Sequence, residues 1–143
     1  MFSPDKLARF CAKPPAERLL IAEAAFYLAM ARLLLLCIPF RKIAPRLARQ
    51  PRDGRDADAI VRADVRRAVM TAARHVPWQA LCLPQAMAAK YMLARRGFTS
   101  TLRFGVGRDA AGDFLAHAWL EAGNAVVIGA GGTDPITPIA QFG

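Results

Sequence analysis

The sequence has few cysteines and no phosphate-binding loop. Its three cysteines, Cys11, Cys37 and Cys82, form no CxxC pair and no even set. This spacing argues against a disulfide framework and against a structural zinc site. A glycine-rich loop of the GxxxxGK type is also missing, so nothing in the chain indicates ATP use. We therefore expect a protein without metal or cofactor that works in the reducing cytoplasm.

Acidic residues are also scarce. Eleven Asp and Glu stand against twenty Lys and Arg, which leaves a formal net charge of +9. A charge of this sign favours an acidic partner such as nucleic acid, anionic lipid or an acidic peptide. The basic residues, Lys90 and Arg96 among them, are spread through helical stretches with few aromatic residues between them. This pattern is more typical of solvated helix faces, so we expect no nucleic-acid partner.

The most hydrophobic segment, residues 19–40, is long enough to raise the question of a membrane helix. Glu23 and Arg32 interrupt it, and Pro39 ends it. No small-residue cleavage site follows Cys37, so a removable signal peptide fits poorly. We expect a buried core helix, and the alternative is a peripheral contact between this helix and a membrane.

Helices are predicted throughout the first two thirds of the chain. A short helix begins near Pro4, and a long one follows Pro14-Pro15, with apolar residues from Leu19 to Ile38 recurring at helical spacing. A basic segment then leads to a loop at 50–54. Further helices are predicted over residues 56–75 and 83–96.

Short runs of alternating or β-branched residues follow. Strands are predicted over residues 99–106, 114–121 and 125–128, joined by turns at 107–112 and around Gly123-Asn124. Helices first and strands later predict an α+β domain, with a helical N-terminal half followed by a small antiparallel sheet.

Cys82 lies at the start of the last predicted helix. The helix dipole and the unpaired backbone amides at this end favour the thiolate, and the same amides could hold an oxyanion. The alternative is that Cys82 is a small buried hydrophobic residue, which is what we expect of Cys11 and Cys37.

His117 is a polar residue in an otherwise apolar strand. A period of two places it on the same face as Trp119 and Glu121. A histidine in such a strand is commonly structural unless a thiol lies opposite it. A cysteine at a helix start followed by a histidine on a later strand is the arrangement of thiol hydrolases.

One set of stretches points to a known family: residues 14–18, 39–41, 76–86, 95–98, 102–106, 116–121, 126–129 and 136–140. Together they resemble the leader peptidase of lasso-peptide pathways, the B protein. The resemblance covers nearly the whole chain and implies a transglutaminase-like, papain-type cysteine protease core with Cys82 as nucleophile and His117 as base. It implies one peptidase domain over residues 1–143, with an N-terminal helical part at 1–50 and a catalytic core at 56–143.

The third catalytic residue departs from the family pattern, in which an acid on the next strand orients the imidazole. A two-residue turn places His117 opposite Ala130, and a three-residue turn places it opposite Gly129, and neither residue can serve. Asp134 could fold back, or a backbone carbonyl or water could orient a Cys-His dyad. The remaining candidates are Asp113 and Glu121.

Gln79 precedes the nucleophile closely and could donate to an oxyanion beside the Cys82 amide, as a glutamine does in papain-like enzymes. An exposed turn residue is the alternative.

The resemblance also implies partners. They are the leader of a precursor peptide, a separate leader-recognition protein and an ATP-using macrolactam cyclase. The separate recognition protein is expected because nothing in the first half resembles the winged-helix-like module of some family members. Two other readings stay open: an acyl transferase that uses the same Cys-His site, and a non-catalytic scaffold.

Overall fold

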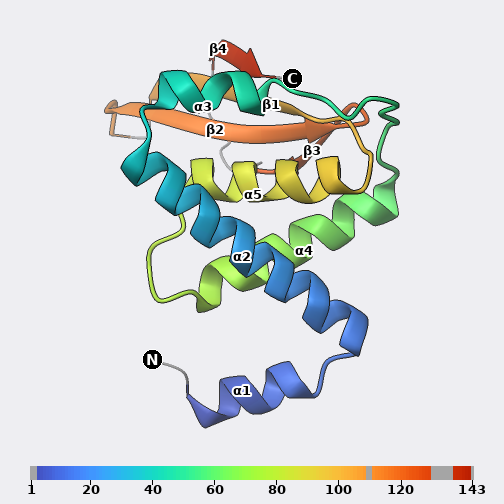
Figure 1. The fold of residues 1–143 in the computed structure, drawn as a ribbon. Helices are drawn as coiled ribbons and strands as arrows, with labels where there is room; N and C mark the ends of the chain where they lie inside the picture. The colour runs from blue at the N-terminus through green and yellow to red at the C-terminus, as the bar shows by residue number, and fades with distance from the viewer. Residues whose placement is uncertain (1–2, 109–110, 130–136, 143) are drawn as a thin grey trace.

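The computed structural model describes residues 3–108, 111–129 and 137–142. In these residues, five helices precede a four-stranded antiparallel sheet (Figure 1). The expected α+β order is confirmed. The elements are α1 (Pro4–Cys11), α2 (Pro15–Cys37), α3 (Phe40–Leu47), α4 (Ala59–His75), α5 (Cys82–Arg95), β1 (Thr101–Arg108), β2 (Phe114–Ala122), β3 (Ala125–Ile128) and β4 (Thr137–Phe142).

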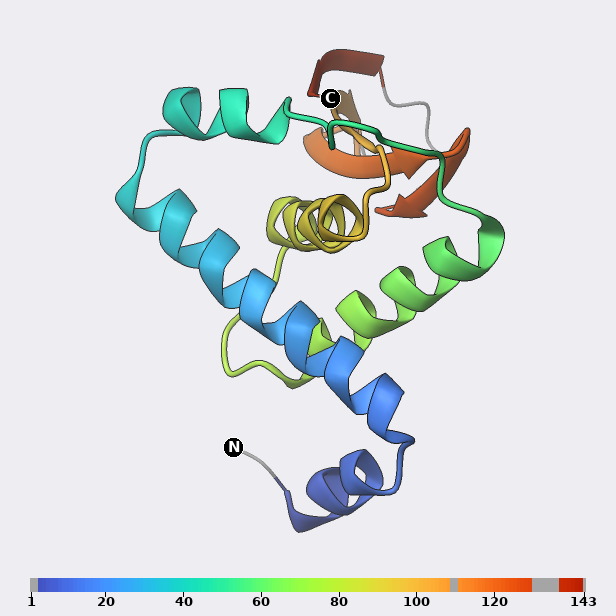
Figure 2. The same cartoon turned by 45° about the vertical axis from the view of Figure 1, so that its right-hand side comes forward.

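Helix α5 lies between the sheet and the crossed pair α2 and α4. The view along α5 shows this layering, with the sheet on one side and the two long helices on the other (Figure 2). Because it is enclosed on both sides, α5 is apolar almost all round, as a central helix must be. Its fully buried side chains include Met87, Met92 and Leu93. Truncating one of these to alanine should cost about 2–5 kcal/mol.

Helix α2 carries apolar side chains on its exposed face as well as on its buried face. Ile21, Ala24, Leu28 and Ala31 are buried, and α2 packs on α4 and α5. The expectation of a buried core helix therefore holds for one face. The prediction was wrong for Leu19, which is 71% exposed.

The exposed face of α2 carries large apolar side chains at spacings of seven and three residues, so they form one stripe along the helix. Its large members are Leu19, Phe26, Leu33 and Leu36. By length and composition α2 is also apolar enough to cross a membrane, with a mean hydropathy of 2.0. The core helix of a soluble protein can have the same length and composition.

The strand order is β3-β2-β1-β4. Gly123 and Asn124 have φ values of 57° and 64°, so the β2–β3 hairpin has the two-residue turn that the sequence predicts. The pairing then shifts: Glu121 faces Val126, but Leu120 faces Ile128. Val127 is therefore the extra residue of a β-bulge.

Two elements were not predicted from the sequence. Helix α3 has only eight residues and contains Pro45, yet Ile43 and Leu47 are buried one turn apart. Strand β4 pairs with β1 at the edge of the sheet, and it contains Pro138, which edge strands tolerate.

Candidate active site

Cys82 is the first residue of α5, as the sequence predicts. Leu81 precedes it in an extended conformation, and no side chain caps this end of the helix. Pro84 has no N–H group, so the amides of Cys82 and Leu83 are the first-turn donors left for an anion. The thiol is half-buried. A reactive carbonyl placed at this thiol would meet both amides.

The loop that leads into α5 is held by the helix itself. The side chain of Gln85 donates a hydrogen bond of 2.7 Å to the carbonyl oxygen of Ala80, two residues before the thiol. Trp78 packs against the core, and the guanidinium of Arg32 lies 5.9 Å from the centre of its ring. Gln85 thus positions Cys82, a role that the sequence analysis missed; the only signal was its place one turn after the thiol.

His117 lies on β2 and faces Gly105 of β1. Its ring stacks on Trp119 with centroids 6.1 Å apart, and its Nε2 atom is hydrogen-bonded to the carbonyl oxygen of Gly129. A carbonyl only accepts, so Nε2 carries the hydrogen and Nδ1 carries the lone pair. The basic nitrogen of the ring is therefore Nδ1.

Glu121 shares the outer face of the sheet with His117 and Trp119, as the sequence predicts. Its carboxylate accepts hydrogen bonds from Arg103 at 2.8 Å and from the Trp119 indole at 3.0 Å. Glu121 is therefore engaged with Arg103 and Trp119 rather than with the imidazole.

Helix α5, which begins with Cys82, packs on strand β2, which carries His117. The two side chains themselves are not joined. Both elements run from left to right in Figure 1, so the start of α5, where the thiol is, lies on the same side as the start of β2. However, Leu120 and Ala122 face the helices, and His117 alternates with them. Among the hydrogen bonds of the described residues, none links the thiol to the imidazole.

Of the other predicted site residues, Asp113 and Gln79 lie in separate loops. Asp134 and Ala130 lie outside the described residues. Asp113 is exposed just before β2, and Gln79 is exposed in the loop before α5. In the described part of the chain, no group of three or more His, Cys, Asp or Glu side chains could hold a metal ion.

The fold and the site define an α+β protein with a half-buried thiol at the start of its central helix. The model of the Transglutaminase-like superfamily matches residues 24–141, a span that contains both Cys82 and His117. The chain belongs to this superfamily, and membership indicates cysteine-dependent protease or transferase chemistry. No curated protein and no solved structure matches the chain.

Proposed function

We propose that the protein is a cysteine peptidase that removes the leader from a ribosomally made precursor during lasso-peptide maturation. The observation that carries this proposal is the position of Cys82, at an uncapped helix start inside a transglutaminase-like domain. The resemblance to lasso leader peptidases supports the substrate class.

The proposed reaction follows from the atoms at the two sites. His117 Nδ1 takes the thiol proton, and the thiolate of Cys82 attacks the scissile carbonyl. The amides of Cys82 and Leu83 receive the oxyanion. The imidazolium then returns the proton to the leaving amine, a thioester forms, and water hydrolyses it to free the enzyme.

This reaction requires His117 to approach Cys82. In the described conformation its ring lies on the outer face of the sheet, so the start of β2 must turn to carry the ring over the first turn of α5. Phe114 and Ala116, which flank that part of the strand, are exposed. Their side chains oppose the turn little, but it would break the pairing of this segment with residues 105–108 of β1 and the hydrogen bond between His117 and Gly129.

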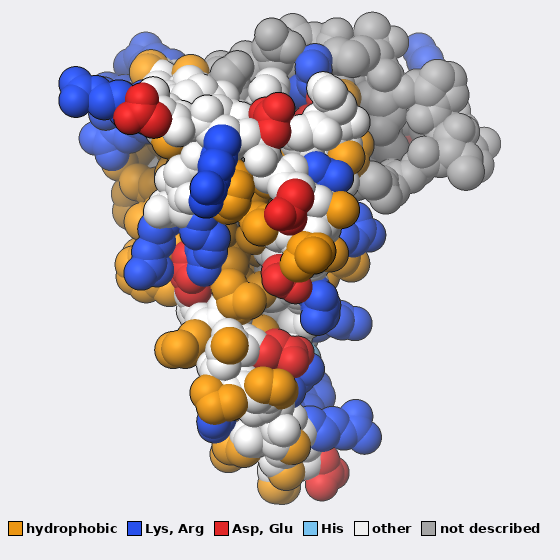
Figure 3. Space-filling view, turned by 90° about the vertical axis from the view of Figure 1, so that its right-hand side faces the viewer, with side chains coloured by type: hydrophobic (Ala, Val, Ile, Leu, Met, Phe, Trp, Pro, Cys, Tyr) orange, Lys and Arg blue, Asp and Glu red, His pale blue; other side chains and the backbone are white. Residues whose placement is uncertain are grey.

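Substrate capture is proposed to depend on the separate leader-recognition protein. The exposed apolar stripe of α2 is the surface we assign to its docking. Apolar side chains mixed with Lys and Arg gather over the lower part of the molecule, where α1 and the start of α2 lie (Figure 3). A docked partner would present the cleavage site at high effective concentration.

The docking role is tested by comparing cleavage rates with and without the recognition protein, at subsaturating precursor. We expect a clear acceleration that Leu33→Glu abolishes, whereas Ile60→Glu on α4, also exposed, retains it. Equal rates with and without the partner would mean that this chain reads the leader by itself.

A scaffold is the second candidate function, favoured by the outward position of His117. The two candidates differ in what Cys82→Ala does. A peptidase loses cleavage in Cys82→Ala and in His117→Ala while both variants stay folded, because the two side chains act as one proton-transfer unit. Cys37→Ala, which removes an exposed thiol on α2, should retain activity.

The product distinguishes hydrolysis from acyl transfer at the same site. Mass spectrometry of the precursor, with water as the only acceptor, should show a free leader and a free core peptide. Near-normal turnover by Cys82→Ala would sink the peptidase assignment, and product formation only with an added amine would favour the transferase.

A further inference from the structure

A second candidate site lies beside the C-terminal half of α5. A cavity of about 220 Å³ opens between α3 and α5, and its wall includes Arg46, Arg49 and Lys90. No acidic side chain lines it, and Tyr91 and Gln50 supply its uncharged polar groups. The wall therefore concentrates positive charge around a space large enough for a small molecule.

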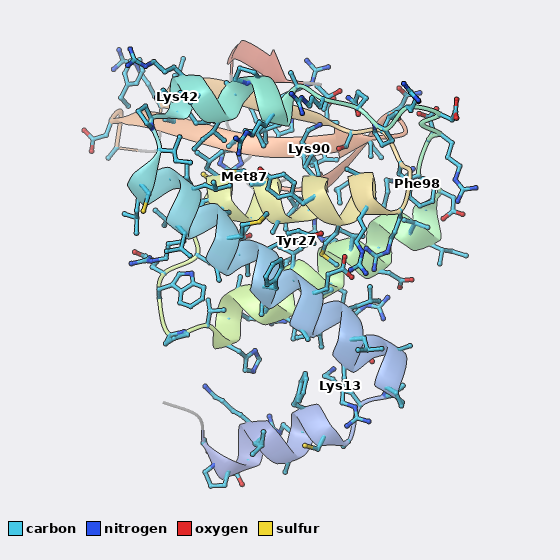
Figure 4. All side chains as sticks on the ribbon, viewed as in Figure 1. Lys13, Tyr27, Lys42, Met87, Lys90 and Phe98 are labelled. Carbon is cyan, nitrogen blue, oxygen red and sulfur yellow. The ribbon has the colours of Figure 1, made fainter. Side chains whose placement is uncertain are left out.

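Lys90 is the most informative residue of this wall. It was predicted to lie on a solvated helix face, and this was wrong: its side chain is 3% exposed. Figure 4 shows it between α5 and the strands above. Burial lowers the pKa of Lys90 to about 8, so the ammonium is still mostly charged at neutral pH.

The charge of Lys90 has no counter-charge in the described chain. Its Nζ atom donates to the carbonyl oxygen of Ser100 at 2.6 Å, and the Ser100 hydroxyl is 3.5 Å away. No described carboxylate forms an ion pair with Lys90, Arg46 or Arg49. A buried charge is rarely kept without a partner, because its desolvation is costly.

The groups around Lys90 are fixed in place. The Gln50 side chain donates to the Ser100 carbonyl at 2.7 Å and accepts from the Ser100 amide at 3.2 Å. The ammonium of Lys90 has three hydrogens, and its contacts with Ser100 use at most two of them. At least one hydrogen therefore stays available to a ligand. Burial raises the pKa of Tyr91, although Arg46 opposes the shift, so its phenol stays protonated and able to donate.

We propose that this cavity binds an oxyanion of the phosphate class, either free phosphate or a phosphate monoester. Two guanidinium groups and one ammonium suit a dianion better than a monocarboxylate, and arginine matches the geometry of phosphate oxygens. Lys90 is eight residues from Cys82, about 12 Å along the helix, so the site is separate from the thiol. It does not depend on the proposed peptidase reaction.

The test is a titration of the purified protein by calorimetry at neutral pH and constant ionic strength, with inorganic phosphate, phenyl phosphate, acetate and chloride as probes. We expect inorganic phosphate or phenyl phosphate to bind, and acetate and chloride to bind more weakly. Tighter binding of inorganic phosphate would indicate free phosphate as the natural ligand, and tighter binding of phenyl phosphate would indicate a phosphate monoester. Lys90→Met and Arg49→Gln should each weaken binding at least about tenfold.

Arg74→Gln is the matched control, since it removes an exposed arginine of α4 that does not line the cavity. It should bind phosphate like the wild type. Arg49 is exposed, so its variant tests the site without removing the buried charge of Lys90. Equal affinity in Arg49→Gln and Arg74→Gln, equal binding of acetate and phosphate, or no phosphate binding at millimolar concentration would overturn the proposal.

Discussion

The imidazole of His117 is hydrogen-bonded to the main-chain carbonyl of Gly129, across the β2–β3 ladder. The β-bulge at Val127 shifts the pairing just before Gly129, so Gly129 lies beside Trp119. A neutral carbonyl fixes the tautomer and the orientation of the ring, but it stabilises an imidazolium less than a carboxylate would.

Gly129→Ala should disturb this relationship. Gly129 has φ 86°, and an added Cβ would lie 2.7 Å from the Ala118 oxygen and 2.8 Å from the Trp119 Cβ. We expect a loss of about 1–3 kcal/mol in the free energy of unfolding, together with slower cleavage.

Gly112→Ala is the control, since Gly112 has φ 83° but nothing within 4 Å of the added atom. Gly112→Ala introduces the backbone strain without the steric clash. Urea unfolding should therefore show a smaller loss in the free energy of unfolding than for Gly129→Ala. Identical losses in the two variants would contradict the steric explanation.

The third catalytic member can be identified by neutralising each acid in turn. If Asp134 orients His117, Asp134→Asn should lower the cleavage rate more than Asp113→Asn or Glu121→Gln. Small and equal effects would favour a dyad held by the Gly129 carbonyl. Thermal unfolding of each variant separates a catalytic effect from a structural one, notably for Glu121, which binds Arg103.

Glu23 and Arg96 join α2 to α5 through two hydrogen bonds of 2.7 Å. The hydrogen bond from Arg96 is the main reason that the pKa of Glu23 is lowered in the folded protein. The stability it provides is therefore present above the unfolded-state pKa of about 4.3 and is lost as pH falls through the folded value. Glu23→Gln should cost about 1–3 kcal/mol at neutral pH, and less in acid.

The control for this pair is Glu17→Gln, which breaks the more exposed ion pair with Lys13. Its cost should stay below about 1 kcal/mol. Chemical denaturation at several pH values measures both variants, and a Glu23→Gln cost that does not shrink in acid would contradict the assigned ion pair.

Lys90 should destabilise the ligand-free protein at neutral pH. Its folded pKa of about 8 lies below the ordinary value of 10.5, so between these values the unfolded chain binds a proton that the folded chain lacks. Stability should therefore rise with pH across that window. In phosphate-free buffer, Lys90→Met should gain about 1–3 kcal/mol at neutral pH and lose this advantage toward pH 10.5.

Lys42→Met, at an exposed position of α3, should show neither effect. Urea unfolding of wild type and both variants at neutral and alkaline pH provides the measurement. A destabilised Lys90→Met at neutral pH would contradict the view that the buried charge lacks a partner.

Most of the fold could be predicted from the sequence, but only part of the candidate site could. Gly123-Asn124 specified the hairpin turn, because adjacent residues that tolerate positive φ strongly favour it. The partner of His117 was not predictable, since Val127 and Ile128 are both buried and alternation cannot show which of two apolar residues is the bulge. The burial of Lys90 was not predictable either, because only the tertiary packing of α5 encloses its side chain.

The central position of α5 also bears on how the chain is made. Helices α2 and α4 leave the ribosome before α5, and the strands that cover its other side come last. A nascent chain ending near His75 thus exposes two apolar faces whose common partner has not yet been synthesised. We expect such a fragment to need a chaperone, and the thiol of Cys82 to reach its place only when the strands close over α5.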